Sequence, residues 1–187
     1  AYHALFLRQL QAHYVYPCIS RFDIQGALAP EQIRCALEAD PEISAVYVTS
    51  PTYDGVVSDI EEIARIAHSY GKTFIVDEAH GAHFGFYPAF PESAVSCGAD
   101  IVIQSVHKTL PAFTQSAVLH LCSDRVPAEA LEEFLDIYES SSPSYVLMAG
   151  MGRLVPFLQT EGPARFEALA EHLRTFYEKS RALTHLH

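Results

Sequence analysis

Short apolar runs alternate with helix-forming segments along the first part of the chain, and this alternation limits the fold more than any other feature. The runs are Ile43–Thr49, Thr73–Val76 and Ala99–Gln104. Their length and their content of β-branched residues predict buried strands, and strands that alternate with helices are typical of parallel sheets with crossover connections. The sequence therefore predicts an α/β fold with a mostly parallel sheet flanked by helices.

Helix signals lie between the predicted strands. Proline is favoured at the first helical position, and the residue before a proline disfavours helix, so a helix is expected from Pro30 to near Asp40. Ser58 and Glu61 match a capping box, which predicts that the next helix begins there. We expect that helix to end at Gly71, because glycine commonly terminates helices.

One further strand is expected at Ala117–Leu121, and the chain is predicted to be helical after it. Two apolar stripes at helical spacing are Leu131, Phe134, Leu135 and Tyr138, and then Phe166, Leu169, Leu173 and Phe176. The Ser140–Pro143 stretch separates them. We predict that residues 1–145 form part of one large domain. Residues 146–187 are expected to form a helical connection toward a missing C-terminal domain.

Composition excludes several classes of protein. With 187 residues, 49% of them hydrophobic, the chain can form a substantial core, and disorder is not expected. The net charge of -11 and the lack of a Lys/Arg block argue against nucleic acid as a partner. No apolar run is long enough to cross a membrane, and the four cysteines show no CxxC pair. We therefore expect a soluble cytoplasmic protein with reduced thiols.

Asp77 and Lys108 are the most informative pair of functional residues. Asp77 follows one predicted strand, and Lys108 follows the next, 31 positions later. The carboxyl ends of parallel strands meet at one edge of a sheet, where ligands gather, and Thr49 falls at the same edge. A carboxylate can keep a pyridine nitrogen protonated and an amine can form a Schiff base, so this pair suits pyridoxal phosphate (PLP).

The segment around Asp77 has three competing interpretations. Asp77 to His80 spells a helicase signature, but the chain has no GxxxxGK[ST] loop to bind the phosphates. Asp77, His80 and His83 could ligate a metal ion, although they lack the helical i,i+4 presentation that metal sites often use, and we expect no bound metal. Alternatively, Asp77 caps the next turn and the two histidines form structural hydrogen bonds.

The segment around Lys108 favours the cofactor. Ser105, His107 and Lys108 offer a hydroxyl, an imidazole and an amine within four residues, which suits a phosphate held beside a reactive amine. The competing interpretation is a surface lysine beside a structural histidine. Because Ile101–Ile103 and Leu110–Phe113 are largely apolar, we expect Lys108 to lie in a partly dry pocket that favours its neutral form.

Five segments of the chain resemble one known family. They are Val76–Phe86, Gln104–Ser116, Thr49–Asp59, Ile66–Gly71 and Ser141–Tyr145. Together they are similar to the group I ornithine/lysine/arginine decarboxylases of the aspartate-aminotransferase fold, over about residues 1–160. The resemblance implies that the chain is an incomplete PLP-binding large domain of fold type I.

The resemblance also implies roles for individual residues. Lys108 would form the Schiff base with PLP, Asp77 would pair with the pyridine nitrogen, and His80 would lie near the phenolic oxygen. Ala79 would pack against the ring, and Ser105 with His107 would hold the phosphate. The implied reaction is decarboxylation of a basic amino acid, lysine, arginine or ornithine, to a polyamine-type amine. The family also implies a homodimer or a higher homo-oligomer, in which the Ser140–Ser144 loop reaches toward the partner. Alternatively, this loop is a Ser/Pro linker before a helix.

The ends of the chain limit what the resemblance implies. The family carries a phosphate-binding cup and a His-Lys-Ser motif upstream of the segment that Ala1–Leu10 resembles, and a small domain after the segment that ends at His187. Without the cup, we expect this chain alone to bind PLP weakly. Two alternatives stay open: another fold type I enzyme, such as an aminotransferase or a lyase, and an inactive truncated fragment that acts as a non-catalytic module.

Overall fold

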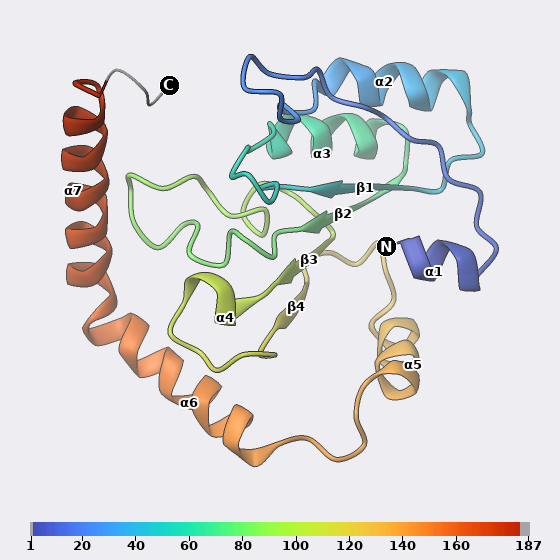
Figure 1. The fold of residues 1–187 in the computed structure, drawn as a ribbon. Helices are drawn as coiled ribbons and strands as arrows, with labels where there is room; N and C mark the ends of the chain where they lie inside the picture. The colour runs from blue at the N-terminus through green and yellow to red at the C-terminus, as the bar shows by residue number, and fades with distance from the viewer. Residues whose placement is uncertain (1, 184–187) are drawn as a thin grey trace.

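A computed structural model describes residues 2–183, and its centre is one four-stranded sheet (Figure 1). The strands are β1 (Ala45–Thr49), β2 (Thr73–Asp77), β3 (Ile101–Gln104) and β4 (Val118–Leu121), in the order β1-β2-β3-β4. The first three are parallel, and β4 is antiparallel to β3. The predicted α/β fold with a mostly parallel sheet is therefore confirmed.

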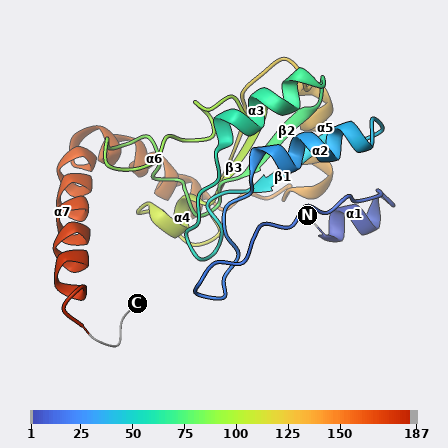
Figure 2. The same ribbon diagram turned by 90° about the horizontal axis from the view of Figure 1, so that it is seen from above.

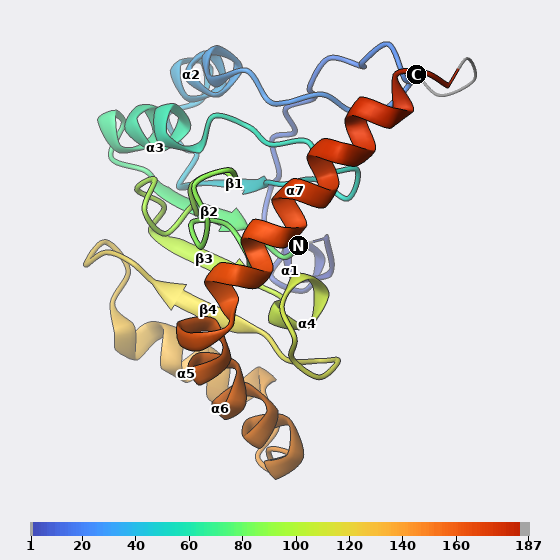
Figure 3. The ribbon, with the colours of Figure 1, turned by 90° about the vertical axis from the view of Figure 1, so that its left-hand side faces the viewer.

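Seven helices accompany the sheet in the described part of the chain. They are α1 (Tyr2–Leu7), α2 (Pro30–Ala39), α3 (Ile60–Ser69), α4 (Val106–Thr109), α5 (Ala128–Tyr138), α6 (Tyr145–Thr160) and α7 (Gly162–Ser180). The helices α2 and α3 lie against one face of the sheet (Figure 3). The helix α7 lies apart from the sheet and is joined to it through α6 (Figure 2).

The main core forms between the sheet and the helices α2 and α3. Burial alternates along β1 and β2, so every second residue of these strands faces the helices. Val48, Phe74 and Val76 from the sheet pack with Ile63 and Ile66 from α3. Burial of one such side chain stabilises the fold by about 1.5–3 kcal/mol. This core leaves the other face of the sheet free to carry polar groups.

The helix α3 begins in a different way from the one predicted. Asp59, and not Ser58, is the N-cap, and its side chain accepts a hydrogen bond from the Glu62 N–H. The predicted capping box of Ser58 and Glu61 is therefore wrong. The Ser58 side chain is buried and accepts a hydrogen bond from the Leu28 N–H instead, at 3.1 Å. The Ser58 hydroxyl, which the local pattern predicted to cap the helix, thus makes a long-range hydrogen bond.

The other helix boundaries agree with the sequence. Pro30 is the first residue of α2, and α2 ends at Ala39, next to the predicted end. Gly71 follows α3 with a φ of +70°, a left-handed conformation that glycine adopts without strain. The α6 helix begins at Tyr145, close to the predicted boundary between two parts of the chain, although the division itself stays a prediction. Residues 1 and 184–187 of the predicted terminal segments lie outside the described residues.

A second, smaller core joins the end of the sheet to the last two helices. Its buried residues are Ala82, Val106, Leu110, Leu154 and Phe166. Phe86 and Phe166 stack with ring centroids 5.9 Å apart, which links the loop after β2 to α7. No residue of α5 is buried, and Leu169, Leu173 and Phe176 of α7 are exposed. No helix within residues 2–183 is long and apolar enough to cross a membrane.

Candidate active site

The carboxyl ends of β1, β2 and β3 lie side by side and form the edge that carries the predicted site. Thr49 pairs with Asp77, and Asp77 pairs with Ile103. Backbone hydrogen bonds continue beyond the strands, from the Ser50 N–H to the Asp77 carbonyl and from the Glu78 N–H to the Ile103 carbonyl. The loops that follow the three strands therefore start from fixed, adjacent positions, as parallel sheets require.

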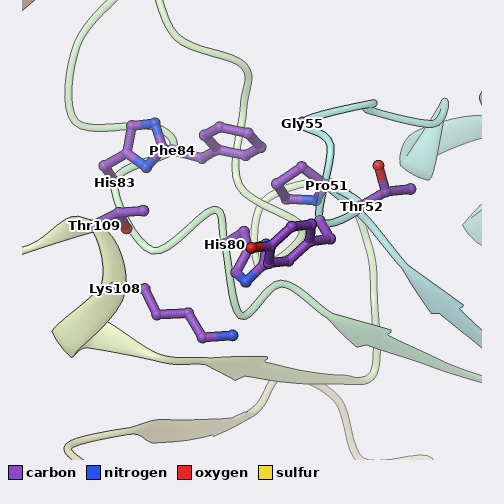
Figure 4. Close-up of a pocket in the computed structure, with 9 residues that line it drawn as sticks. Pro51, Thr52, Gly55, His80, His83, Phe84, Lys108 and Thr109 are labelled. Carbon is purple, nitrogen blue, oxygen red and sulfur yellow. The ribbon is translucent and has the colours of Figure 1, made fainter. Parts of the chain in front are cut away.

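A pocket of about 620 Å³ opens among these loops (Figure 4). It is lined by Pro51, Thr52, Tyr53, Gly55, His80, His83, Phe84, Lys108 and Thr109. Two of the predicted site residues, His80 and Lys108, therefore line the same pocket. Asp77, Ala79, Ser105 and His107 are not among its lining residues. Tyr53, His83 and Thr109 lie within the segments that resemble the family, but their spacing in the sequence did not identify them as pocket residues.

The carboxylate of Asp77 is held by two donors from different elements. Its Oδ2 accepts a hydrogen bond from the Tyr47 hydroxyl at 2.9 Å, and its Oδ1 accepts one from the Ala79 N–H at 3.1 Å. The second bond is the turn-capping role that the structural interpretation proposed. A carboxylate offers about four acceptor positions, so these two bonds leave Asp77 able to accept a further donor.

Lys108 projects from the end of α4 and is exposed. Lys108 does line the pocket, but it is exposed, so the expectation that its surroundings are partly dry is wrong for this chain. Two apolar residues close to it in the sequence, Val106 and Leu110, are buried in the second core. Apolar residues next to Lys108 in the sequence thus pack into the core, whereas Lys108 itself is exposed to solvent.

Ser105 and His107 flank the start of α4. The Nδ1 of His107 lies 2.8 Å from the Ser116 carbonyl, and because a carbonyl only accepts, this nitrogen carries a proton. This bond joins α4 to the far end of the loop that follows it. Ser105 is the N-cap residue of α4, but its side chain makes no capping hydrogen bond. Its hydroxyl is therefore not used to cap the helix.

The two histidines after β2 have different surroundings. The ring centroids of His80 and Tyr53 lie 5.5 Å apart. The ring of His83 packs edge-on against Phe84 and Phe90, at 4.9 and 5.1 Å, and its buried Nδ1 has no hydrogen-bond partner. Burial lowers the pKa of His83, which favours its neutral form.

The metal interpretation finds no support in this geometry. Within residues 2–183, no three His, Cys, Asp or Glu side chains are grouped so that they could hold a metal ion, and Asp77, His80 and His83 are no exception.

Glu78 is a buried carboxylate that the sequence analysis overlooked. It is 1% exposed and accepts hydrogen bonds from the Ala94 N–H at 2.8 Å, the Ser93 hydroxyl at 2.8 Å and the Gln104 amide at 2.6 Å. Burial raises the pKa of Glu78, and these hydrogen bonds oppose the rise. Gln104 in turn contacts His120 on β4 at 3.0 Å. This network connects β2, β3 and β4 through side chains that do not line the pocket.

Asp100 forms a second buried polar cluster at the opposite edge of the sheet. Its carboxylate accepts hydrogen bonds from Ser123 and the Phe74 N–H, and it lies 3.0 Å from the ring of His68. Ser123 and His68 both contact the aspartate, so the trio lacks the contact between nucleophile and base that a catalytic triad needs. The cluster stabilises the amino ends of β2 and β3.

A family model and similar proteins of known sequence show the family of this chain. The model of the Orn/Lys/Arg decarboxylase major domain matches residues 1–170. The uncharacterized protein YaaO of Bacillus subtilis (strain 168) is 43% identical over 152 residues, which cover 80% of this chain and 32% of that protein. An arginine decarboxylase of Bacillus cereus is 35% identical over 157 residues, which cover 82% of this chain and 34% of that protein.

A comparison of structures gives the same fold. The crystal structure of mouse CSAD matches with a TM-score of 0.59 and 20% identity, over 84% of this chain and 37% of that chain. A likeness at this identity shows the fold alone, which is the fold type I arrangement of PLP-dependent enzymes. The chain spans about a third of the length of each of these three proteins.

Proposed function

The chain belongs to the Orn/Lys/Arg decarboxylase family of PLP-dependent enzymes, and we propose that the protein carrying it decarboxylates a basic amino acid to a polyamine-type amine. One observation carries the proposal: Lys108 and His80 line a single pocket at the sheet edge where Asp77 ends β2. Arginine is the first substrate to test, because it is the substrate named for the Bacillus cereus relative. Lysine and ornithine are the other candidates.

The residues present fit the chemical groups of PLP. Lys108 offers an accessible amine in the pocket, and Asp77 retains acceptor capacity for a ring nitrogen. Ala79 lies two residues after Asp77 and is a small residue that would pack against the flat ring. The hydroxyl of Ser105 can donate to a phosphate, and His107 can donate to it only through a protonated Nε2, because its Nδ1 proton is given to the Ser116 carbonyl. These five residues and His80 are the ones that would hold the cofactor.

When bound, PLP supplies an electron sink for cleavage of the bond to the α-carboxylate. In this proposal Asp77 holds a proton on the ring nitrogen, and its carboxylate is kept in place by Tyr47 and Ala79. Lys108 would hold the cofactor through its Nζ, and the same atom would afterwards carry a proton. His80, whose ring lies beside that of Tyr53, would lie near the phenolic oxygen.

We further propose a cytoplasmic homodimer in which the loop of residues 140–144 reaches the partner's site. This loop is exposed throughout, and it lies between α5 and α6. Phe134, Ile137 and Tyr138 of α5 are also exposed and offer apolar surface near it. Sedimentation of the full-length protein tests the dimer, and a monomer at working concentration would contradict it.

The central experiment maps the lysine that reacts with PLP. The chain has three lysines, Lys72, Lys108 and Lys179. The full-length protein is incubated with PLP, reduced with borohydride, digested and examined by mass spectrometry, and each of the three basic amino acids is then tested for release of carbon dioxide. We expect the adduct on Lys108, its loss in Lys108→Ala, and its retention in Lys72→Arg, the matched control.

The same experiment separates the alternatives. An adduct on Lys108 without carbon dioxide release from any of the three amino acids would favour another fold type I reaction, such as transamination. No adduct on any lysine would favour a non-catalytic module. The non-catalytic module is retained as an alternative because Lys108 is exposed in this chain.

A further inference from the structure

Tyr47 lies beside Asp77 on the face of the sheet that α2 and α3 leave uncovered. In the β1–β2 register Thr49 pairs with Asp77, so Tyr47 stands two residues earlier on the same face. Its side chain runs along that face, and its hydroxyl donates to the Asp77 Oδ2 at 2.9 Å. The Tyr47 residue is 43% exposed, so packing against the core does not explain its position.

The hydroxyl of Tyr47 can act only as a donor to this carboxylate. Burial and the hydrogen bond to Asp77 raise the pKa of Tyr47 to about 12, so the phenol keeps its proton at neutral pH. The other carboxylate oxygen is held by the Ala79 N–H from the following loop. Two donors from two different elements therefore fix both oxygens, and with them the plane of the carboxylate.

Building on the proposed function, we propose that Tyr47 is a positioning residue, which orients Asp77 for the ring nitrogen of PLP and shares the negative charge of its carboxylate. Tyr47 acts through Asp77 and does not itself touch the cofactor. A carboxylate fixed by a second donor loses less freedom when it binds its partner. Loss of the Tyr47 hydroxyl should therefore weaken PLP binding and change how the bound cofactor responds to pH.

The test is a double-mutant cycle on PLP binding in the full-length protein. The dissociation constant of PLP is measured by fluorescence for the wild type, Tyr47→Phe, Asp77→Ala and the double variant. We expect Tyr47→Phe to raise the dissociation constant about ten-fold, as for loss of a hydrogen bond to a charged group. In the Asp77→Ala background the same change should have no effect, because the acceptor is gone.

A matched control separates this role from a structural one. The Tyr70 hydroxyl donates to the Glu38 carboxylate at 2.8 Å, and neither of these two residues lines the pocket. Tyr70→Phe removes the same kind of bond and should leave PLP binding unchanged. The visible absorbance of the bound cofactor, followed against pH, should shift in Tyr47→Phe and not in Tyr70→Phe. Thermal melting of the cofactor-free proteins should be similar for both variants.

The outcomes distinguish the inference from the proposed function. Equal PLP binding by the wild type and Tyr47→Phe, with the adduct still on Lys108, would overturn the role of Tyr47 and leave the proposed function intact. A loss of affinity that persists in the Asp77→Ala background would also overturn it, because Tyr47 would then act directly. A wild type that binds no PLP would overturn both.

Discussion

Glu78 and Gln104 are joined by a hydrogen bond of 2.6 Å that links the end of β2 to the end of β3. Glu78 directly follows Asp77, and Gln104 directly precedes Ser105 and the short helix with Lys108. The bond therefore braces the two chain segments that carry the proposed catalytic carboxylate and amine. Neither Glu78 nor Gln104 lines the pocket, so this bond supports the site without touching the pocket.

Glu78→Ala should destabilise the protein strongly. The change removes the acceptor of three buried donors, from Ser93, Ala94 and Gln104. Because unsatisfied buried donors carry the full desolvation penalty, we expect a loss of about 3 kcal/mol in the free energy of unfolding. Urea denaturation measures it. Glu92→Ala, at an exposed position, is the control, and equal losses in the two variants would contradict the role of the brace.

Gly81 and Gly152 should respond in opposite ways to alanine. A Cβ atom at Gly81 would lie 2.7 Å from Glu78 Cγ, 2.8 Å from Pro51 Cδ and 2.9 Å from Phe84 Cδ2, so we expect a loss of about 1–3 kcal/mol. At Gly152, inside α6, nothing lies within 4 Å, and alanine should stabilise the helix by about 0.5–1 kcal/mol. Thermal unfolding compares the two, and a stable Gly81→Ala variant would show that the loop has room to adjust.

Asp100 should make part of the stability depend on pH in the acid range. Burial alone would raise its pKa, but hydrogen bonds from Ser123, the Phe74 N–H and His68 outweigh burial and lower the pKa below 3.8. Between the folded pKa and 3.8 the unfolded chain binds more protons, so stability falls as pH falls. The contribution of Asp100 is present above 3.8 and is lost as pH falls through the folded pKa.

The measurement compares urea unfolding at pH 5 and pH 3. Asp100→Asn should lose less stability over this interval than the wild type, since it has no carboxylate to protonate. Asp124→Asn, nearby in sequence and exposed, should behave as the wild type does. An Asp100→Asn variant with the same pH dependence as the wild type would show that other carboxylates dominate acid unfolding.

His83→Phe should stabilise the protein. The ring of His83 packs among Phe84 and Phe90, and its buried Nδ1 has no partner, so an apolar ring of similar shape removes an unsatisfied polar atom. We expect a gain of about 1 kcal/mol at pH 7. Denaturant unfolding measures the gain, and a loss of stability would show that the nitrogen has a favourable contact in solution.

The gain from His83→Phe should increase as the solution is acidified. Burial lowers the pKa of His83 from 6.5, so the contribution of the wild-type residue to stability is present above 6.5 and is lost as pH falls through the folded pKa. Phenylalanine has no such loss. His172→Phe, at an exposed position of α7, is the control and should show no comparable change with pH.

The sequence predicted the sheet because local patterns determine it. Apolar runs, Pro30 and Gly71 each act over a few neighbouring residues, and the strands and helices lie close to their predicted ranges. The prediction failed at Ser58, where a long-range bond to Leu28 replaced the helix cap. Local rules cannot detect a partner that lies 30 positions away.

The same limit explains which site residues could be found. Asp77 and Lys108 are recognisable because each follows a predicted strand, whereas Tyr47 becomes visible only through its contact across two strands. Alternation along β1 shows that Tyr47 faces away from the core, but it does not show what the hydroxyl meets. The exposure of Lys108 was missed because apolar neighbours describe the path of the backbone and not the direction of one side chain.

The reversal of β4 has a consequence for the freedom of Lys108. Gln104 and Val118 are register partners, so the stretch between them leaves the sheet and returns to it at one place. The bond between His107 and the Ser116 carbonyl closes the stretch a second time. The backbone that carries Lys108 is therefore held at both ends. The amine changes its position only by rotation about its own side-chain torsions. The fold thus limits the positions that the Lys108 amine can reach before any ligand binds.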